Sequence, residues 1–344
     1  MKKDLFDFRF FSGVVEDIDD PKMLGRVRVR IHAIHSDQTN INKSEGTGLP
    51  FDFVPWAYVM MPCTGASMTG FGQSHGLLPG SWVIGFARDG ELYNDLVIIG
   101  SLAGVPAKAN PNKTASKPIA FFGKDGLYPD KEFIGEPDTN RLNRNELSFK
   151  DDQWKPVPKI KQDERITGID KAFNGSWDEL ETSYDAKYPF NKVQSGPSGT
   201  VFEFDESPGA SRIAEFHGPS HSYREINHDG SQQIKIVGNN FEISLKDKNL
   251  FVKGDLNITC NGDTNILTNG DTNIETNGAT KLKTDSLDAE VEKDASISAK
   301  TASVSVTKDL SIKSLDGINI NSGLGKCLIQ GQAVVIRGQK TAKF

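Results

Sequence analysis

The chain has 344 residues, of which 36% are hydrophobic and 33 are glycine, a composition typical of a folded protein with room for two or three domains. Its formal net charge of −6 disfavours a dominant nucleic-acid or anionic-membrane surface, because both need clustered positive charge. The three cysteines are too far apart for the disulfide framework of a small secreted protein, and we expect free thiols at Cys63, Cys260 and Cys327.

No targeting segment is expected at the start of the chain. Asp4, Asp7 and Arg9 interrupt any apolar core that a signal peptide would need. The most apolar stretch, residues 54–63, is about half as long as a membrane-spanning helix. The sequence therefore predicts a protein that is made soluble in a cytoplasm.

Residues 1–105 predict a small closed β-barrel of the OB-fold type. Five runs rich in β-branched and aromatic residues are separated by turn residues, and closure of such a barrel removes exposed strand edges. In the second run valine and isoleucine alternate strictly with arginine, which places them on opposite faces. The runs are RFFSGVVED, GRVRVRIH, WAYVMMP, GSWVIGFA and NDLVIIGSL.

The arginine face of the second run suggests a nucleic-acid alternative, because OB-folds can follow a phosphate backbone. The base-stacking aromatics and the overall positive charge of such barrels are missing. We therefore expect Arg26, Arg28 and Arg30 to be solvated or to pair with acids of a protein neighbour, and we expect no nucleic acid as a partner.

Six short motifs follow one another in the first hundred residues: Asp20-Pro21, Gly25-Arg26-Val27, Pro55-Trp56-Ala57, Pro79-Gly80-Ser81-Trp82-Val83, Arg88-Asp89-Gly90 and Asp95-Leu96-Val97-Ile98-Ile99-Gly100. In their order and spacing this segment resembles the N-terminal OB-fold of the central spike protein in the baseplates of contractile-tailed bacteriophages. That domain is related to the VgrG spikes of type VI secretion. The resemblance implies that the barrel docks on a threefold baseplate hub protein.

Residues 106–195 predict an extended polar linker, because eight prolines and many charged residues break any long periodic element. Residues 171–188 could hold a short helix. Some relatives of the spike family carry a lysozyme-like domain here, but about 90 residues are fewer than that domain and its linkers should need. The acids of this segment lie in no pattern that would hold two carboxylates at glycosidase spacing, and we expect no catalytic residue among them. They are Glu132, Glu136, Asp151, Asp152, Asp178, Glu179 and Glu181.

Three other motif-like groups do not meet their requirements, and no metal or cofactor site is expected. His217 and His221 are separated by a Gly-Pro pair, which forbids the helix that would align them as metal ligands. The glycines of residues 70–76 miss the dinucleotide-binding spacing by one residue. Residues 323–327 lack both the first glycine and the hydroxyl residue of a phosphate-binding loop.

Residues 196–250 predict a β-rich neck whose short strands are separated by turn formers. The expected strands are GTVFEFDE, SRIAEFH, SYREIN, QQIKIVG and FEISLK. The stretches GTVFEFDESPGASRI and DGSQQIKIVGNNFEI resemble the segment that leads into the needle of phage spikes and VgrG proteins. This second match follows the barrel in the order that the family has.

Residues 254–285 return to nearly the same sequence every eight residues. We expect the glycine of each octad to lie at a corner and the aliphatic residue four positions later to face inward. The corner residues are Gly254, Gly262, Gly270 and Gly278, and the inward residues are Ile258, Ile266, Ile274 and Leu282. After residue 285 the octad loosens, although short apolar–polar alternation persists.

One octad is too short to enclose a core, because eight extended residues reach at most about 27 Å. A single-chain β-helix needs coils of roughly 18 residues or more, and no such multiple marks this repeat. Three identical chains that each contribute one octad would build a prism with about 24 residues per turn. Residues 251–344 therefore predict a needle, an intertwined trimeric β-helix; a solvent-exposed amyloid-like or surface-layer repeat is the alternative.

The end of the chain contains no histidine after His228, so the His-x-His iron site that some phage needles carry is absent. The resemblance then implies that the tip is closed by packing or by a separate PAAR-type cap.

Together these features predict a homotrimeric central spike of a phage tail baseplate. It would reside in the virion, dock on the hub and puncture the outer membrane of the host on sheath contraction, with no chemistry of its own. A VgrG-type secretion spike is a variant of this prediction, and the lack of an attached hub domain at the N-terminus favours the phage protein. Two other classes stay open: a spike that also cleaves peptidoglycan or envelope polysaccharide, and a nucleic-acid-binding barrel on a fibrous stalk.

Overall fold

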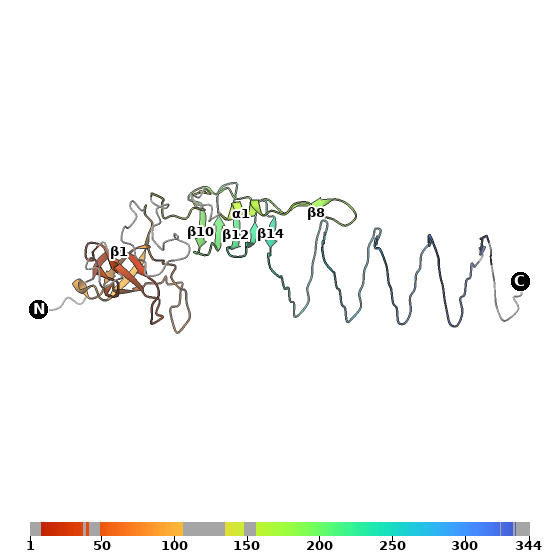
Figure 1. Ribbon diagram of the computed structural model, residues 1–344, viewed down its shortest axis with the longest axis horizontal. Helices are drawn as coiled ribbons and strands as arrows, with labels where there is room; N and C mark the ends of the chain where they lie inside the picture. The colour runs from red at the N-terminus through yellow and green to blue at the C-terminus, as the bar shows by residue number, and fades with distance from the viewer. Residues whose placement is uncertain are drawn as a thin grey trace. The chain divides into compact units, whose positions relative to one another are not determined.

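The structure is a computed structural model that describes residues 8–36, 39–40, 49–105, 135–147, 156–323, 325–332 and 334. The chain divides into two units, residues 1–265 and residues 266–344. The first unit contains a closed β-barrel and an open five-stranded sheet, and the fold is mainly β (Figure 1). In the described part of the chain, no helix is both long and apolar enough to cross a membrane.

Five strands close the barrel in the order β1-β2-β5-β7-β6. Only the pairing of β5 with β7 is parallel. All five predicted runs form these strands, and the prediction of a closed five-stranded barrel is confirmed. They are β1 (Arg9–Asp17), β2 (Val27–Ile31), β5 (Trp56–Val59), β6 (Trp82–Ala87) and β7 (Leu96–Leu102).

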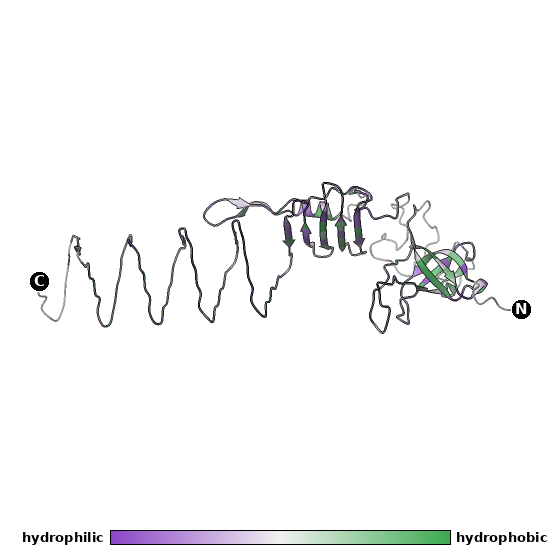
Figure 2. Cartoon of the chain, turned by 180° about the vertical axis from the view of Figure 1, so that it is seen from behind, coloured by the Kyte–Doolittle hydropathy of each residue, from purple (hydrophilic) through white to green (hydrophobic). Residues whose placement is uncertain are grey.

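The barrel core follows from the alternation of β2 and its neighbours. Val27, Val29 and Ile31 are at most 1% exposed, and they pack with apolar residues of the other four strands. Figure 2 shows the barrel strands largely in the hydrophobic colour. Gly85 lies at a bulge in β6, where an added Cβ would come within 2.2 Å of the Val97 carbonyl oxygen. The connections contain β3 (Thr39–Asn40), β4 (Leu49–Pro50), η1 (Phe51–Phe53) and η2 (Gly90–Leu92).

The open sheet is an antiparallel meander in which each strand pairs with the next. Its strands are β10 (Asn191–Ser195), β11 (Val201–Asp205), β12 (Arg212–His217), β13 (Ser222–Ile226) and β14 (Gln232–Lys235). β10 comes from residues that the sequence assigned to the linker. The predicted strand at residues 241–246 pairs with nothing in the described part of the chain.

The middle segment contains one helix and one small hairpin, and its described part packs on the sheet. Helix α1 (Val157–Asp163) begins beside two prolines, which a first helical turn tolerates. The helix expected within residues 171–188 is wrong: the hairpin of β8 (Ile169–Asp170) and β9 (Ser176–Trp177) turns there through Gly175 at φ 89°. The apolar cluster under the segment is Leu142, Val157, Val201, Phe216 and Tyr223, with Leu147, Ile160, Tyr184 and Val193 against it. The segment is therefore more than an extended connection, because isolated apolar residues between its prolines dock on β11 to β13.

After β14 the backbone runs back and forth without pairing to any described residue (Figure 1). It bends every eight residues, at 237–238, 245–246, 253–254, 261–262, 269–270 and 277–278. Further bends follow at 285, 292–293, 300, 307–308 and 315–316. The eight-residue period therefore begins before the glycine octads, and beyond them the bending continues at a spacing of seven to eight residues.

Candidate functional site

The open sheet carries apolar side chains on its uncovered face. Phe202, Phe204, Ile213 and Ile234 are between 42% and 59% exposed. Phe204 pairs in register with Ile213, which pairs with Ile226, so an apolar row crosses three strands. A contiguous exposed apolar patch of this kind marks an interaction surface.

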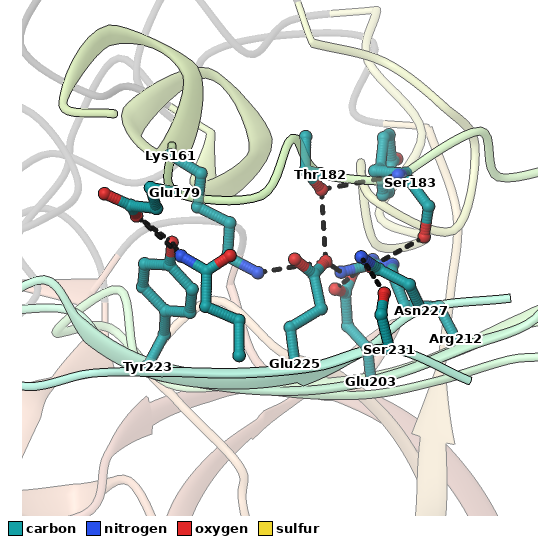
Figure 3. A network of polar contacts seen from close by, with 12 residues as sticks. Lys161, Glu179, Thr182, Ser183, Glu203, Arg212, Tyr223, Glu225, Asn227 and Ser231 are labelled. Carbon is teal, nitrogen blue, oxygen red and sulfur yellow. Dashed lines mark hydrogen bonds and ion pairs between the residues drawn. The ribbon is translucent and has the colours of Figure 1, made fainter. Parts of the chain in front are cut away.

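The opposite face of the same sheet is covered by the middle segment and buries charged side chains. Arg212 donates from Nη1 to Glu225 at 2.8 Å and from Nη2 to Glu203. Lys161 Nζ of helix α1 lies 3.1 Å from Glu225 Oε1. All four side chains are at most 3% exposed (Figure 3). Two positive and two negative groups thus form a charge-balanced quartet between helix and sheet.

Strand register brings the quartet together. Glu203 of β11 pairs with Ala214 of β12, and Ala214 pairs with Glu225 of β13, so the two glutamates share a row with one small residue between them. Arg212 lies two residues along β12 on the same face, because side chains of a strand alternate. Burial of these groups is tolerated because each charge has an opposite charge beside it.

A second polar cluster adjoins the quartet and is centred on Glu179. Its carboxylate accepts hydrogen bonds from the Tyr223 hydroxyl and from Gln233 Nε2, the latter at 2.8 Å. Its other oxygen accepts from the Ile166 amide at 2.9 Å and from Lys235 Nζ at 3.1 Å. Glu179 therefore ties the middle segment to the last strand, β14.

The electrostatics of both clusters follow from burial and pairing. Burial lowers the pKa of Lys161, and Glu225 only partly offsets this. Burial opposes the charge of Arg212 as well, yet the nearby Glu203 and Glu225 raise its pKa overall. Burial and the Glu179 carboxylate together raise the pKa of Tyr223. The pKa of Glu179 is lowered: burial acts against this, but the hydrogen bonds from Tyr223, Ile166 and Lys235 prevail. These groups therefore hold the middle segment on the sheet, because each charged side chain is bound by its partner.

The acids that a glycosidase would need have structural partners wherever the structure describes them. Glu136 binds Arg141 and Arg144, and Glu181 lies 3.0 Å from Arg165. Glu179 has the partners described above. Asp178 accepts a hydrogen bond from the Gly168 amide at 2.7 Å. Glu132, Asp151 and Asp152 lie outside the described residues.

The three arginines at the start of and within β2 are bound within the barrel itself, where the sequence suggested solvent or a neighbouring protein. Arg26 bonds Asp20 at 2.7 and 3.0 Å, and Arg30 bonds Glu16 at 2.8 Å. Arg28 donates to three backbone carbonyls, those of Phe51, Asp52 and Val54. The Arg26 guanidinium holds the pKa of Asp20 well below its usual range, assisted by backbone amides. Acids of the same domain thus neutralise Arg26 and Arg30, and backbone carbonyls of that domain hold Arg28.

The other groups singled out in the sequence have local roles. His217 ends β12 and bonds Ser220, and His221 lies 2.8 Å from Glu164. Cys63, Cys260 and Cys327 are exposed free thiols. No three His, Cys, Asp or Glu side chains are grouped for metal binding within the described ranges.

The octad residues remain uncovered in the single chain. Ile258, Ile266, Ile274 and Leu282 are between 72% and 86% exposed. Gly254, Gly262, Gly270 and Gly278 fall in the backbone bends. Their assignment to the inside and the corners of a closed needle stays a prediction, because closure needs strands that one chain does not supply.

Comparison with known proteins gives the family. Residues 33–182 match the family described as the Gp5 N-terminal OB domain. The pre-baseplate central spike protein Gp5 of Enterobacteria phage T4 is 36% identical over 139 residues, which cover 40% of this chain and 22% of that protein. Protein Gp5 of Vibrio phage KVP40 is 34% identical over 274 residues, which cover 72% of this chain and 62% of that protein.

The chain is a homologue of the phage Gp5 spike proteins. Its barrel is an OB domain of that family, as the sequence predicted. The chain spans less than two thirds of the length of either relative.

Sequence reasoning missed the buried quartet. In VFEFD of β11, phenylalanines occupy one face while valine and two acids occupy the other, so alternation alone favours burial of the phenylalanines. The structure buries the acidic face instead, because α1 supplies Lys161 and β12 supplies Arg212. The only available signal was that arginine and glutamate recur in phase on three successive strands.

Proposed function

We propose that the chain is a structural, homotrimeric spike of a phage tail baseplate. Its barrel docks on the hub protein, and residues 251–344 form a trimeric β-helical needle that a PAAR-type protein caps. The spike assembles in the host cytoplasm and becomes part of the virion. On sheath contraction it punctures the outer membrane of the target cell.

The observation that carries this proposal is the regular bending of a chain whose aliphatic residues nothing covers. Bends recur every eight residues from 237 to 278, while Ile258, Ile266 and Ile274 stay at least 79% exposed. Full burial of each such side chain contributes about 1.5 to 3 kcal/mol, so a stack of them strongly favours association. Two further copies supply both the missing strands and the missing apolar contacts.

The open face of the sheet supports the same arrangement. Ile234 on that face precedes Ile258 by 24 residues, which is three octads, after which one chain returns to the same face of the proposed three-sided prism. The apolar face of the neck, residues 196–250, would then continue the inward face of the needle. One axis would run through both, with Ile234, Leu250 and Ile258 on it and the apolar series interrupted at Glu242.

The work of this spike is mechanical, and we propose that it cleaves no cell-wall glycan. Support comes from the acids of the middle segment, which are engaged by basic side chains or backbone amides where described. A zymogram on purified peptidoglycan tests this: a cleared band at about the mass of this chain would contradict it.

The direct test of the spike itself is its native mass. We expect light scattering of the purified protein to give three times the 37.7 kDa mass of one chain. A stable folded monomer at micromolar concentration would overturn the proposal.

A further inference from the structure

The hairpin of β8 and β9 belongs to a projecting arm, residues 165–180, that the proposed function leaves unused. Its two strands are short, and Ile169 pairs with Trp177. Four of its apolar side chains, Ile166, Phe173, Trp177 and Leu180, are between 42% and 54% exposed. A two-stranded hairpin is marginally stable alone, so an arm with this many exposed apolar groups needs a surface to lie on.

The arm is anchored at both ends of its path. At its base, Lys235 Nζ of β14 donates to the Glu164 carbonyl at 2.6 Å and to Glu179. Farther along, the Thr259 hydroxyl donates to the Asp170 carbonyl at 2.5 Å. The arm therefore runs from Lys235 to Thr259 of its own chain.

These two anchor residues are 24 positions apart, which is three octads. In a trimeric prism they lie on the same face, three layers apart. Threefold symmetry then places two strands between them, one from each sister chain. Strands lie about 4.8 Å apart, so the gap spans about 14 Å, and the six residues from Glu164 to Asp170 reach about 20 Å. The arm is long enough to cross both sister strands.

The octad position that faces the arm is set by Thr259. Because side chains alternate, Thr259 and Lys235 point to the arm while Ile258 points the other way. The residues at the same octad position in between are Ile243 and Phe251, which are 81% and 89% exposed in the single chain. The later residues of this series are Leu267, Glu275 and Lys283. The arm-facing position is thus apolar in both octads that the arm would cross and becomes charged farther on.

The opposite face differs between these two octads: the position of Ile258 is held by Glu242 in the first and by Leu250 in the second. Glu242 and Lys248, which alternate with Ile243 and Phe251, form an ion pair at 2.6 Å. The first octad therefore has its apolar Ile243 toward the arm and the charged Glu242 away from it, whereas the second octad has an apolar residue on each face, Phe251 and Leu250. An outward apolar pair at this place needs a cover, and the arm is the part of the chain anchored beside it.

We propose that the arm of each chain is a clip that lies across Ile243 of one sister chain and Phe251 of the other. This inference rests on the proposed trimer and adds a residue-level contact between its chains. The clip would lock the start of the needle from outside, where the first octad has Glu242 in place of an aliphatic side chain at the inward position.

Disulfide trapping tests the clip in a background of Cys63→Ser, Cys260→Thr and Cys327→Ser. Threonine suits position 260, because Thr268 and Thr276 occupy it in the next two octads. We expect the pair Trp177→Cys with Phe251→Cys to give covalent trimers on non-reducing gels after boiling. Each single variant should give monomers. The pair Trp177→Cys with Lys283→Cys is the matched control, since Lys283 holds the same octad position three octads beyond Thr259, and it should also give monomers.

Two outcomes would overturn the clip and leave the trimer standing. One is a native trimer in which the first pair forms no link between chains. The other is dimers from Phe251→Cys alone, since these would place Phe251 on the axis. A monomeric native mass by light scattering would overturn the clip and the proposed function together.

A double-mutant cycle provides a second measurement that needs no cross-link. Trp177→Ala and Phe251→Ala should each lower the temperature at which SDS-resistant trimers dissociate. The double variant should lose little more than the worse single variant, because both changes remove the same contact. Fully additive losses would contradict the contact.

Discussion

The barrel and the octad segment each have an apolar strand face that needs to be buried. They differ in whether the residues that bury it come from the same chain or from other copies of the chain. In the barrel, Val27, Val29 and Ile31 are at most 1% exposed because five strands of one chain close on themselves. In the octads, Ile258 and Ile266 are 79% and 86% exposed. Strands of four to nine residues linked by turns can close a barrel, whereas one octad per turn leaves the core to be completed by other copies.

The largest mutational effect is expected at Ile266, in the octad segment. Ile266→Asp would bring three carboxylates together on a dry axis, and we expect it to abolish assembly of the needle while the barrel stays folded. Native mass and resistance of trimers to SDS measure the effect. Asn265→Asp is the matched control, because it adds the same charge one position away, on the outward face, and should assemble. SDS-resistant trimers of Ile266→Asp would show that the inward assignment is wrong.

The covered face of the sheet gives the next largest effect, since it buries charges where the barrel buries aliphatics. Lys161→Met leaves Glu203 and Glu225 with Arg212 alone, and the unbalanced buried charge should lower the free energy of unfolding by about 3 to 5 kcal/mol.

The double variant Lys161→Met with Glu225→Gln restores the charge balance and should recover most of that loss. Urea unfolding of the whole purified protein, followed at the transition in which the middle segment and the sheet unfold, reports both values. Equal losses in the single and the double variant would contradict the importance of charge balance.

Within the barrel, Asp20 contributes a stability that depends on pH. Its folded-state pKa lies below the ordinary value, so its contribution is complete above the ordinary carboxyl pKa of about 3.9 and is lost as pH falls below it. Asp20→Asn should cost about 1.5 to 3 kcal/mol at neutral pH, because it removes charged hydrogen bonds. The variant should also show a flatter decline between about pH 4 and pH 2 than the parent. Identical acid profiles would contradict the assignment.

The smallest effect is expected at an octad bend. An added Cβ at Gly262 meets no atom within 4 Å in the single chain, so Gly262→Ala should change the free energy of unfolding by about 1 kcal/mol or less. Gly85→Ala in the barrel is the contrast, since its Cβ would come within 2.2 Å of a backbone oxygen. Thermal melts that rank the two variants in the reverse order would mean that neighbouring chains pack tightly against Gly262.

Much of the fold follows from local sequence patterns. The five barrel runs and four of the sheet strands occur where alternation and turn residues predicted them. The middle segment did not follow from pattern, because its docking uses single apolar residues such as Leu142 and Val157 between prolines. The helix of the middle segment lies at Val157–Asp163 and not within residues 171–188, where it was expected. Positive φ angles at Phe173 and Gly175 form a hairpin turn there.

The sequence by itself determined the barrel, the family and the eight-residue period, since each depends on patterns among residues that are close together along the chain. Only the tertiary structure decided which face of the sheet is covered, because the alternation in β11 favours burial of Phe202, whereas the structure buries Glu203. It also decided that Arg26 and Arg30 serve their own barrel and that Lys161 meets Glu225. These contacts depend on which side chains from distant parts of the sequence lie opposite a strand. Local periodicity carries no information about such long-range contacts.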